Sequence, residues 1–329
     1  MSDRKPLSRR DFLRRVGLAG AGLYLAGCTP EQQAALPTPA SNTIAPTATP
    51  APTTESSSTY GEVALCAVRG QDIAEMTRRA LEAIGGMQRF ISPGADVIIK
   101  PNICTDYYPF EYGATTNPIV VATLVSLALG EGAARVRVMD NPFGGTPQSA
   151  YRISGIEEAV QAAGGQMEVM NKNKFRQAPI PDGVDLKEWV FYQDILDADV
   201  VINVPIAKHH GTTGLTLGAK NMMGTILDRG QIHANLHQRI ADLASRVRPA
   251  LTVVDAVRTL MRNGPTGGNL DDVRTTNTII ASADIVAADS YAATLFGMSA
   301  ADIGYIQAAA GLGLGTLDLS TIKVEELNL

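Results

Sequence analysis

The sequence predicts an α/β fold in which a mainly parallel sheet carries helices on both faces. Two observations point to this class: short apolar runs alternate with helical stretches from residue 60 onward, and several apolar runs end in polar residues. The remaining length, about 270 residues, is enough for one large domain or for two joined lobes. We therefore expect an α/β domain over residues 60–329.

Seven apolar runs predict strands, at Val63–Val68, Asp96–Lys100, Arg135–Asp140, Met167–Asn171, Val200–Val204, Leu251–Asp255 and Thr278–Ala281. Five stretches predict helices, at Ile73–Ile84, Pro118–Leu129, Gly155–Ala163, Leu236–Val247 and Ile285–Phe296. Asn117 and Pro118 begin the second helix, because Asn caps a helix N-terminus and Pro suits its first position. Gly164 follows the third helix, where glycine commonly ends one.

Residues 1–28 predict a signal for export. Arg9 and Arg10 precede an apolar run, Val16–Ala26, of about eleven residues, whereas a membrane-spanning helix needs roughly 20. The arginine pair resembles the twin-arginine export signal, and Leu25-Ala26-Gly27-Cys28 resembles a lipoprotein box, in which Cys28 is lipidated. The alternative is a short amphipathic helix that belongs to the fold. The expected partners are the twin-arginine export machinery and a membrane, reached through lipid on Cys28.

Residues 29–59 consist almost entirely of Pro, Thr, Ala, Ser and Gln. Such a segment cannot bury enough apolar surface to offset its ordering entropy, so it predicts a disordered tether, or equally a glycosylated stalk. In some bacteria an aspartate directly after the lipidated cysteine is associated with retention at the inner membrane. Thr29 stands at that position here, so the sequence does not indicate which membrane holds the protein. We expect an exported, membrane-anchored lipoprotein, in the periplasm or at the cell surface.

Charge and cysteine content narrow the range of partners. The chain has 28 Lys and Arg against 33 Asp and Glu, and six of the basic but only two of the acidic residues precede Val16. The remaining chain is therefore acidic, which argues against nucleic acid as a partner.

Cys66 and Cys104 could form one disulfide, or Cys66 could be a buried free thiol. No C-x-x-C spacing occurs, so no iron–sulfur cluster is expected.

Several predicted strands end in polar clusters. Lys100 and Asn102 end one strand, Asp140-Asn141 follows another, and Asp255 ends a third. In open parallel sheets the ligand site lies at the carboxyl ends of the strands, so these clusters predict a site there. Each cluster alone would equally suit an ordinary turn.

The segment 204–224 is the richest in candidate residues. It joins an apolar strand to a short helix through a loop of small polar residues, and its backbone amides could hold an anion. Lys208 and Lys220 would add positive charge, with Asn221 beside them. The full G-x-x-x-x-G-K-[ST] phosphate motif is absent, so a nucleotide is not indicated.

All four histidines lie between residues 209 and 237. His233 and His237 are four residues apart, which on a helix places both on one face. Together with His210 and a carboxylate they could ligate a metal. Histidine is equally suited to acid–base chemistry near neutral pH, and the third alternative is a capping or hydrogen-bonding role.

The segment after Asp255 is rich in glycine. Gly264 and Gly267 allow a backbone to approach a ligand closely, although a plain surface turn has the same composition. Asp284 suits a helix N-terminus, and Asp289 lies in an otherwise apolar helix, where a carboxylate needs a partner.

These segments together resemble the bacterial and archaeal family known as domain of unknown function 362, over about residues 95–315. The resemblance rests on an ordered set of short motifs: Ile99-Lys100-Pro101-Asn102, Thr115-Thr116-Asn117-Pro118, Pro205 to His210, Lys220-Asn221 with Gly224, His237 with Ile240-Ala241-Asp242-Leu243, Val254-Asp255-Ala256, Gly264-Pro265 with Gly267, Ser282-Ala283-Asp284 with Ala287-Ala288-Asp289, and Gly311-Leu312-Gly313.

The chain departs from the family pattern at two points. The family's Pro-Lys-x-Lys-Thr-His reads Pro205-Ile206-Ala207-Lys208-His209-His210 here, so the first lysine is lost and His210 is favoured over His209 as a functional residue. Many relatives also carry a cysteine-rich ferredoxin region, which this chain lacks. The resemblance thus implies a site and leaves the reaction open.

We expect an exported enzyme, metal-assisted or redox-linked, that acts on a small anionic substrate. Its expected catalytic residues are His210, His237, Lys208 and Asp255. Its expected ligand-binding residues are Lys100, Asn102, Lys220, Asn221, Gly264 and Gly267, and a metal ion would be held by His210, His233 and His237. The alternative is a non-catalytic lipoprotein that binds an anion or a metal.

Overall fold

The structure is a computed structural model that describes residues 63–329. The predicted signal peptide at residues 1–28, its Cys28 and the predicted tether at residues 29–59 lie outside the described residues. The described part belongs to one unit, without a division into two lobes. Within residues 63–329, none of the helices is both long and apolar enough to span a membrane.

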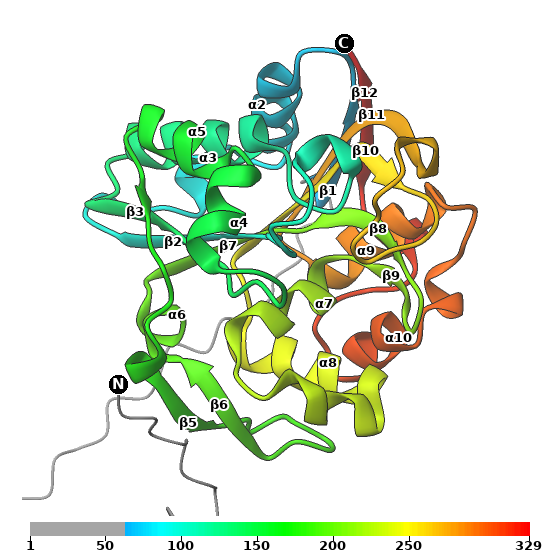
Figure 1. Ribbon diagram of the computed structural model, residues 1–329. Coiled ribbons are helices and arrows are strands. Elements are labelled where there is room, and N and C mark those ends of the chain that lie inside the picture. The colour runs from blue at the N-terminus through cyan, green and yellow to red at the C-terminus, as the bar shows by residue number, and fades with distance from the viewer. Residues whose placement is uncertain (1–62) are drawn as a thin grey trace, which may run out of the picture. The chain divides into compact units, whose positions relative to one another are not determined.

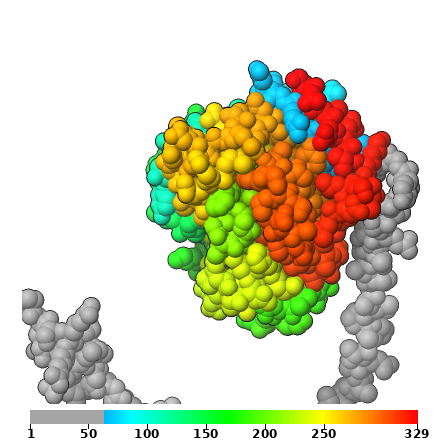
Figure 2. All heavy atoms as spheres, turned by 90° about the vertical axis from the view of Figure 1, so that its right-hand side faces the viewer, coloured from blue at the N-terminus to red at the C-terminus, as the bar shows by residue number. Residues whose placement is uncertain are grey.

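A ten-stranded sheet forms the centre of the described chain (Figure 1). Eight of its strands follow one another in the order β12 (Val324–Asn328), β1 (Leu65–Arg69), β11 (Val273–Ser282), β10 (Leu251–Leu260), β7 (Val200–Val204), β2 (Asp96–Pro101), β3 (Arg135–Val138) and β4 (Gln166–Met167). Six of the nine strand pairings are parallel, so the prediction of a mainly parallel α/β sheet is confirmed. β12 lies parallel to β1, and Figure 2 shows these red and blue ends of the described chain side by side.

Helices cover both faces of the sheet, as the sequence predicts. β1 shows the division most simply, because Cys66 and Val68 join one core cluster and Leu65 and Ala67 join the other. The first face carries α2 (Ile73–Ala83), α3 (Pro118–Gly130), α4 (Pro147–Ile153) and α5 (Ile156–Ala162). The second carries α7 (Gly218–Asn221), α8 (Leu236–Val247), α9 (Ile285–Thr294) and α10 (Gly304–Gly311).

The strand after Pro205 is essential for the site. β7 ends at Val204, and β8 (Ile206–His210) continues the chain beside β10 before turning back into β9 (Gly214–Thr216). Pro205 has no N–H to donate, but its carbonyl accepts from Asp255 N at 2.9 Å. The β8–β9 hairpin thereby extends beyond the sheet and carries Lys208 and His210 with it.

A second, two-stranded sheet of β5 (Phe175–Pro179) and β6 (Glu188–Tyr192) precedes α6 (Gln193–Asp197). Asp242 of α8 holds the turn of this hairpin, because its carboxylate accepts from the backbone N–H groups of Val184, Asp185 and Leu186 at 2.8–2.9 Å. The sequence did not predict this hairpin.

Three predicted strands differ from the structure by four or five residues at one end, and one of them, predicted over Thr278–Ala281, begins at Val273. The strand predicted over Met167–Asn171 is only Gln166–Met167, at the edge of the sheet. The strand predicted to end at Asp255 continues to Leu260, because a long antiparallel partner, β11, pairs with it along most of its length. Asp255 therefore lies inside a strand and not at its carboxyl end.

The cysteines do not pair. Cys66 in β1 and Cys104 after β2 are both free and buried. Burial raises the pKa of the Cys66 thiol to about 12, as expected of a thiol in an apolar core. The disulfide alternative is therefore wrong.

Candidate functional site

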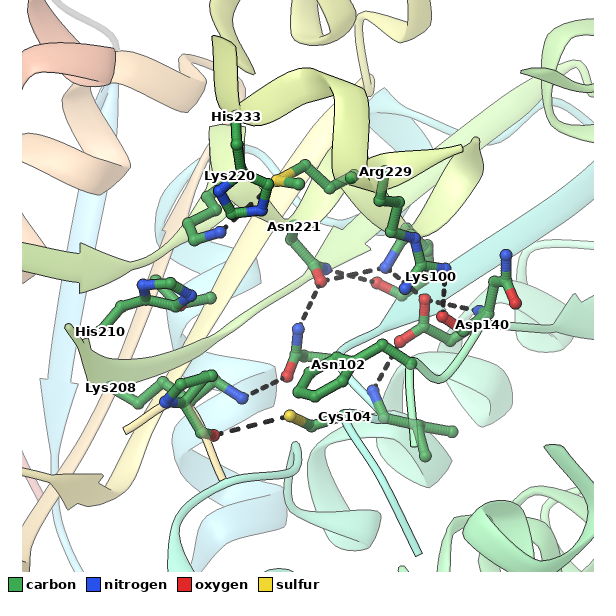
Figure 3. A pocket seen from close by; sticks show the side chains of 18 residues that line it. Lys100, Asn102, Cys104, Asp140, Lys208, His210, Lys220, Asn221, Arg229 and His233 are labelled. Atoms are coloured by element: carbon green, nitrogen blue, oxygen red, sulfur yellow. Dashed lines mark hydrogen bonds and ion pairs between the residues drawn. The ribbon is translucent and has the colours of Figure 1, made fainter. Parts of the chain in front are cut away.

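A cavity of about 340 Å³ opens at the carboxyl ends of β2 and β7 (Figure 3). Its walls come from the segments that follow β2 and β3, from β8 and β9, and from the turns between α7 and α8. Its lining residues are Lys100, Asn102, Ile103, Cys104, Asp140, Asn141, Phe143, Lys208, His210, Thr216, Lys220, Asn221, Met223, Gly224, Arg229, Gly230, His233 and Pro265.

A buried ion pair forms one wall. Lys100, at the end of β2, places Nζ 2.8 Å from Asp140 Oδ1, and both side chains are almost inaccessible. Asp140 also accepts from Ile103 N at 2.6 Å and from Asn141 N at 2.8 Å. Burial lowers the pKa of Lys100, and the Asp140 carboxylate opposes that shift. The pair is thus fixed by the backbone that surrounds it.

Two asparagines connect this pair to a second lysine. Asn221 Oδ1 accepts from Lys100 Nζ at 3.0 Å and from Asn102 Nδ2 at 2.9 Å, while Asn221 Nδ2 donates to Asn203 Oδ1 at 2.9 Å. Asn102 Oδ1 in turn accepts from Lys208 Nζ at 2.9 Å. The order Lys100–Asn221–Asn102–Lys208 forms a continuous chain across the floor of the cavity (Figure 3).

Lys208 is buried and hydrogen-bonded. Besides Asn102, its Nζ donates to Ala114 O at 2.6 Å. Burial lowers the pKa of Lys208, and nearby Cys104 and Asp140 oppose the shift. The Cys104 thiol donates to Pro265 O at 3.5 Å. Lys208 is therefore held in one position at the edge of the cavity.

Lys220 differs from Lys100 and Lys208, because its amine donates to a thioether sulfur and not to an oxygen. The side chain is 8 % exposed, and Nζ lies 3.4 Å from Met223 Sδ. Burial, followed by the charge of Lys208, lowers the pKa of Lys220 to about 8; Cys104 opposes the shift, and Arg229 adds a smaller lowering. This amine is still largely protonated at pH 7, but it loses its proton about two pH units below an ordinary lysine.

His210 faces the same cavity in a defined tautomer. Its Nδ1 accepts from the backbone N–H of Thr212 at 3.2 Å, so the ring proton is on Nε2. Burial, followed by the charges of Lys220 and Lys208, lowers the pKa of His210 to about 3. His210 is therefore a neutral hydrogen-bond donor near neutral pH.

Arg229 completes a cationic lining. Its guanidinium donates to Asn141 O, and burial lowers its pKa. The cavity lining thus contains Lys100, Lys208, Lys220 and Arg229 against one carboxylate, Asp140. Opposite charges in a partly closed cavity attract each other more strongly than in water, so this lining favours a small anion.

Asp289 positions α7, the short helix that carries Lys220 and Asn221. Its carboxylate accepts from Gly218 N at 2.6 Å and from Ala219 N at 2.9 Å. Burial raises the pKa of Asp289 to about 7, although these two hydrogen bonds lower it. These two backbone N–H groups are the partners that a carboxylate in an apolar helix was expected to need.

Seven of the predicted site residues line the cavity: Lys100, Asn102, Lys208, His210, Lys220, Asn221 and His233. Four do not: His237, Asp255, Gly264 and Gly267. Asp140, which the strand-end clusters indicated, and Gly224, which belongs to one of the family motifs, also line the cavity. Cys104, Met223 and Arg229 line it too, and no sequence pattern assigned them to the site.

The three-histidine metal set is not assembled. α8 begins at Leu236, so His233 lies in the preceding 3₁₀ segment (Arg229–Asn235) and the helical four-residue spacing does not apply to it. The His237 ring instead stacks near Tyr305, with centroids 6.4 Å apart. Within residues 63–329 no group of three or more His, Cys, Asp or Glu side chains is arranged around a common point. The structure does not bring His237 together with His210 and His233.

Asp255 also has a different role from the predicted one. Its carboxylate accepts from Asn117 N at 2.7 Å and from Val257 N at 3.0 Å, so both oxygens hold backbone. Burial raises the pKa of Asp255 to about 6. Asn117 in turn caps α3 through Ile119 N. Asp255 therefore fixes the start of α3, and it does not line the cavity beside the histidines.

Gly264 and Gly267 shape a turn outside the cavity. A Cβ on Gly264 would lie 1.8 Å from His209 O, so only glycine allows this approach of two backbones. Gly267 has φ 65°, a conformation that glycine adopts without strain. The turn places Pro265 in the cavity wall, whereas Gly264 and Gly267 do not line the cavity themselves.

The family model described as domain of unknown function (DUF362) matches residues 97–294. The chain is 28% identical to the thylakoid-associated protein of Synechocystis sp. over 246 residues, which cover 72% of this chain and 74% of that protein. Its fold is similar to that of the lactate racemase apoprotein from Thermoanaerobacterium thermosaccharolyticum, at 13% identity and a TM-score of 0.44, over 67% of this chain and 54% of the racemase. The match thus spans about half of the racemase.

Proposed function

The chain belongs to the DUF362 family, whose description assigns no reaction, and we propose from its cavity that it is an enzyme acting on a small anion. The observation that supports this most is the charge of the lining, which contains four cationic side chains and one carboxylate. A cavity of about 340 Å³ accepts a molecule the size of a small carboxylic acid or phosphate ester.

Lys208 and Arg229 are the anion-binding groups in this proposal. The charge of Lys100 is already opposed by Asp140, whereas Lys208 and Arg229 donate to neutral oxygens and keep a net charge. An anion beside them would gain charge-assisted hydrogen bonds in a partly enclosed cavity. The fixed chain from Lys100 to Lys208 would keep these donors in place before the substrate arrives.

Lys220 and His210 supply the chemistry. The lowered pKa of Lys220, about 8, suits proton transfer near neutral pH. The Nε2–H of neutral His210 can donate a hydrogen bond to an oxygen that becomes negative during the reaction. These two side chains lie on one side of the cavity, apart from the Lys100–Asp140 pair (Figure 3).

Isothermal titration calorimetry with acetate and with inorganic phosphate tests the anion site. The wild-type protein should bind at least one of these probes, and Lys208→Gln should weaken that binding on the order of tenfold, the effect of one charge-assisted hydrogen bond. Lys172→Gln is the matched control, because it removes the same charge from an exposed position. Equal affinities for both variants and the wild type would contradict the proposal.

A non-catalytic anion-binding protein is the second candidate. The extensive pairing among Lys100, Asn221, Asn102 and Lys208 favours it, because a rigid, satisfied lining suits capture as well as catalysis. The two candidates differ in one measurable result. Prolonged incubation with a panel of small carboxylic acids and phosphate esters, followed by mass spectrometry, yields a changed compound only if the protein is an enzyme.

We also propose that the protein is exported and held at a membrane by lipid on Cys28. The twin-arginine pattern and the lipoprotein box support this, and a relative is a thylakoid-associated protein. Cys28→Ser should release the protein from the membrane fraction of the expressing cells. Replacing Arg9 and Arg10 by lysine should leave it inside them. A protein that stays in the same fraction in both variants would contradict this location.

A further inference from the structure

The partners of Lys220 distinguish it from the other lysines of the cavity. Lys100 Nζ contacts a carboxylate and Lys208 Nζ contacts two oxygens. Lys220 Nζ donates to Met223 Sδ at 3.4 Å, and a thioether is a weak acceptor. A nine-tenths-buried ammonium group with such a partner is poorly stabilised, so Lys220 loses its proton more easily than an exposed lysine does.

The surrounding charges act in the same direction. Lys208 and Arg229 both disfavour a positive charge on Lys220, and Cys104 is the group that opposes them. An amine that is desolvated and lies near other cations has an available lone pair, which makes it a nucleophile toward carbonyl carbon. The same cations attract the anionic part of a substrate, so they would hold it beside this amine.

His210 provides a donor for the oxygen of such a substrate. Thr212 N occupies its Nδ1, and its Nε2–H is therefore available in the cavity. Figure 3 shows Lys220, His210 and His233 on one side of the cavity and the Lys100–Asp140 pair on the other. A nucleophilic amine, a neutral N–H donor and anion-binding cations thus line one small space.

We propose that Lys220 is a catalytic nucleophile and that the substrate is a small anion with an aldehyde or ketone carbonyl, a 2-oxo acid being the simplest. This rests on the proposed anion site. The Lys220 Nζ lone pair attacks the carbonyl carbon, a C–N bond forms, and the C=O π electrons move to oxygen, beside His210 Nε2–H. The two amine hydrogens and the carbonyl oxygen then leave as water, and an imine remains. No oxidant or reductant is needed for this step.

Reductive trapping tests the imine. The full chain is incubated with glyoxylate or pyruvate and sodium cyanoborohydride, and peptide mapping by mass spectrometry locates the modified lysines. At pH 7 we expect Lys220 to be modified on the order of a hundredfold faster than exposed Lys172, because much more of its amine is neutral. Acetate, which carries no carbonyl that can form an imine, should slow the modification by competing for the anion site.

Two variants serve as controls. Lys220→Arg keeps the charge and cannot form the imine, and Lys220→Met places an apolar chain beside Met223. Both should abolish the rapid modification while Lys172 is modified as before. If either variant fails to fold, the relative modification rates of Lys220 and Lys172 in the wild-type protein are sufficient to test the proposal.

The failure of this inference can be distinguished from the failure of the proposed function. Modification of Lys220 no faster than that of Lys172, in a protein that still binds acetate or phosphate by calorimetry, overturns the nucleophile and leaves the anion site. A protein that neither binds these anions nor modifies Lys220 overturns both.

Discussion

Lys100 Nζ lies 2.8 Å from Asp140 Oδ1, although the two residues are forty positions apart in the sequence. Lys100 lies near the end of β2, and Asp140 follows the end of β3. Both side chains are buried, and the carboxylate also holds the backbone N–H groups of Ile103 and Asn141. The parallel pairing of β2 with β3 brings them together, because it places the carboxyl ends of both strands at one edge. This pair organises the wall of the cavity.

Breaking the pair should destabilise the protein strongly. Asp140→Asn leaves the Lys100 ammonium buried without its counter-charge, so we expect a loss of about 3–5 kcal/mol in the free energy of unfolding. Denaturation by guanidinium chloride measures it. Asp182→Asn is the control, because its pair with Arg248 is exposed and should be worth less than about 1 kcal/mol. Equal losses for both variants would contradict the assignment.

Gly224 should not tolerate a side chain. A Cβ there would lie 2.2 Å from Asp140 Oδ1 and 2.5 Å from Lys100 Nζ, so Gly224→Ala must displace the ion pair. We expect lower thermal stability and weaker anion binding, measured by calorimetry. Gly230→Ala is the matched control in the same wall, because nothing lies within 4 Å of its added Cβ. A Gly224→Ala protein as stable as Gly230→Ala would show that the wall adapts.

The reactivity of Lys220 should depend on pH with a midpoint near 8. Its pKa is lowered to about 8, so the neutral amine accumulates as pH rises through that value. Labelling by an amine-reactive reagent, followed by peptide mass spectrometry, should show this midpoint at Lys220 and a midpoint above pH 10 at exposed Lys172. Affinity for a non-reactive anion should fall over the same range, since a positive charge is lost. Identical labelling profiles at the two lysines would contradict the lowered pKa.

Asp289 should make stability depend on pH. Its folded pKa is raised to about 7 by burial, from an ordinary value near 4 in the unfolded chain. Between these values the folded state binds more protons, so this carboxyl contributes stability at low pH that is lost as pH rises toward 7. Urea denaturation across this range should show a steeper decline for the wild type than for Asp289→Asn.

Asp255 has a raised pKa as well, about 6, so only the difference between the two proteins isolates Asp289. The same variant should weaken anion binding, because one hydrogen bond that positions α7 is lost. Parallel pH profiles for wild type and Asp289→Asn would contradict the role of this carboxyl.

Local sequence patterns predicted the elements that carry the site. β2 and β7 are continuous apolar runs buried on both faces, and the residues directly after such a strand must lie at its carboxyl end. Lys100 and Asn102 could therefore be assigned to the site from the sequence. Lys220 and Asn221 were found through a loop of small polar residues that leads into a short helix.

The errors have physical causes. The proposed metal set depended on a helix that includes both His233 and His237, but α8 begins between them, at the Leu236 predicted from the sequence. Asp255 was placed at a strand end, but β11 extends the pairing of β10 beyond it. Cys104 lies in an irregular segment, and Met223 and Arg229 lie in short 3₁₀ segments, where no periodicity shows which side chains meet.

By itself, the sequence determined the α/β class, the order of most strands and helices and the edge of the sheet at which polar residues gather, because these depend on local apolar patterns. Only the tertiary structure decided which of those residues share a cavity. It joined Asp140 to Lys100, removed His237 and Asp255 from the site, and left Lys220 beside a thioether. Such contacts depend on strand order and on the paths of irregular segments, and a lysine's pKa depends on the neighbours that these place around it.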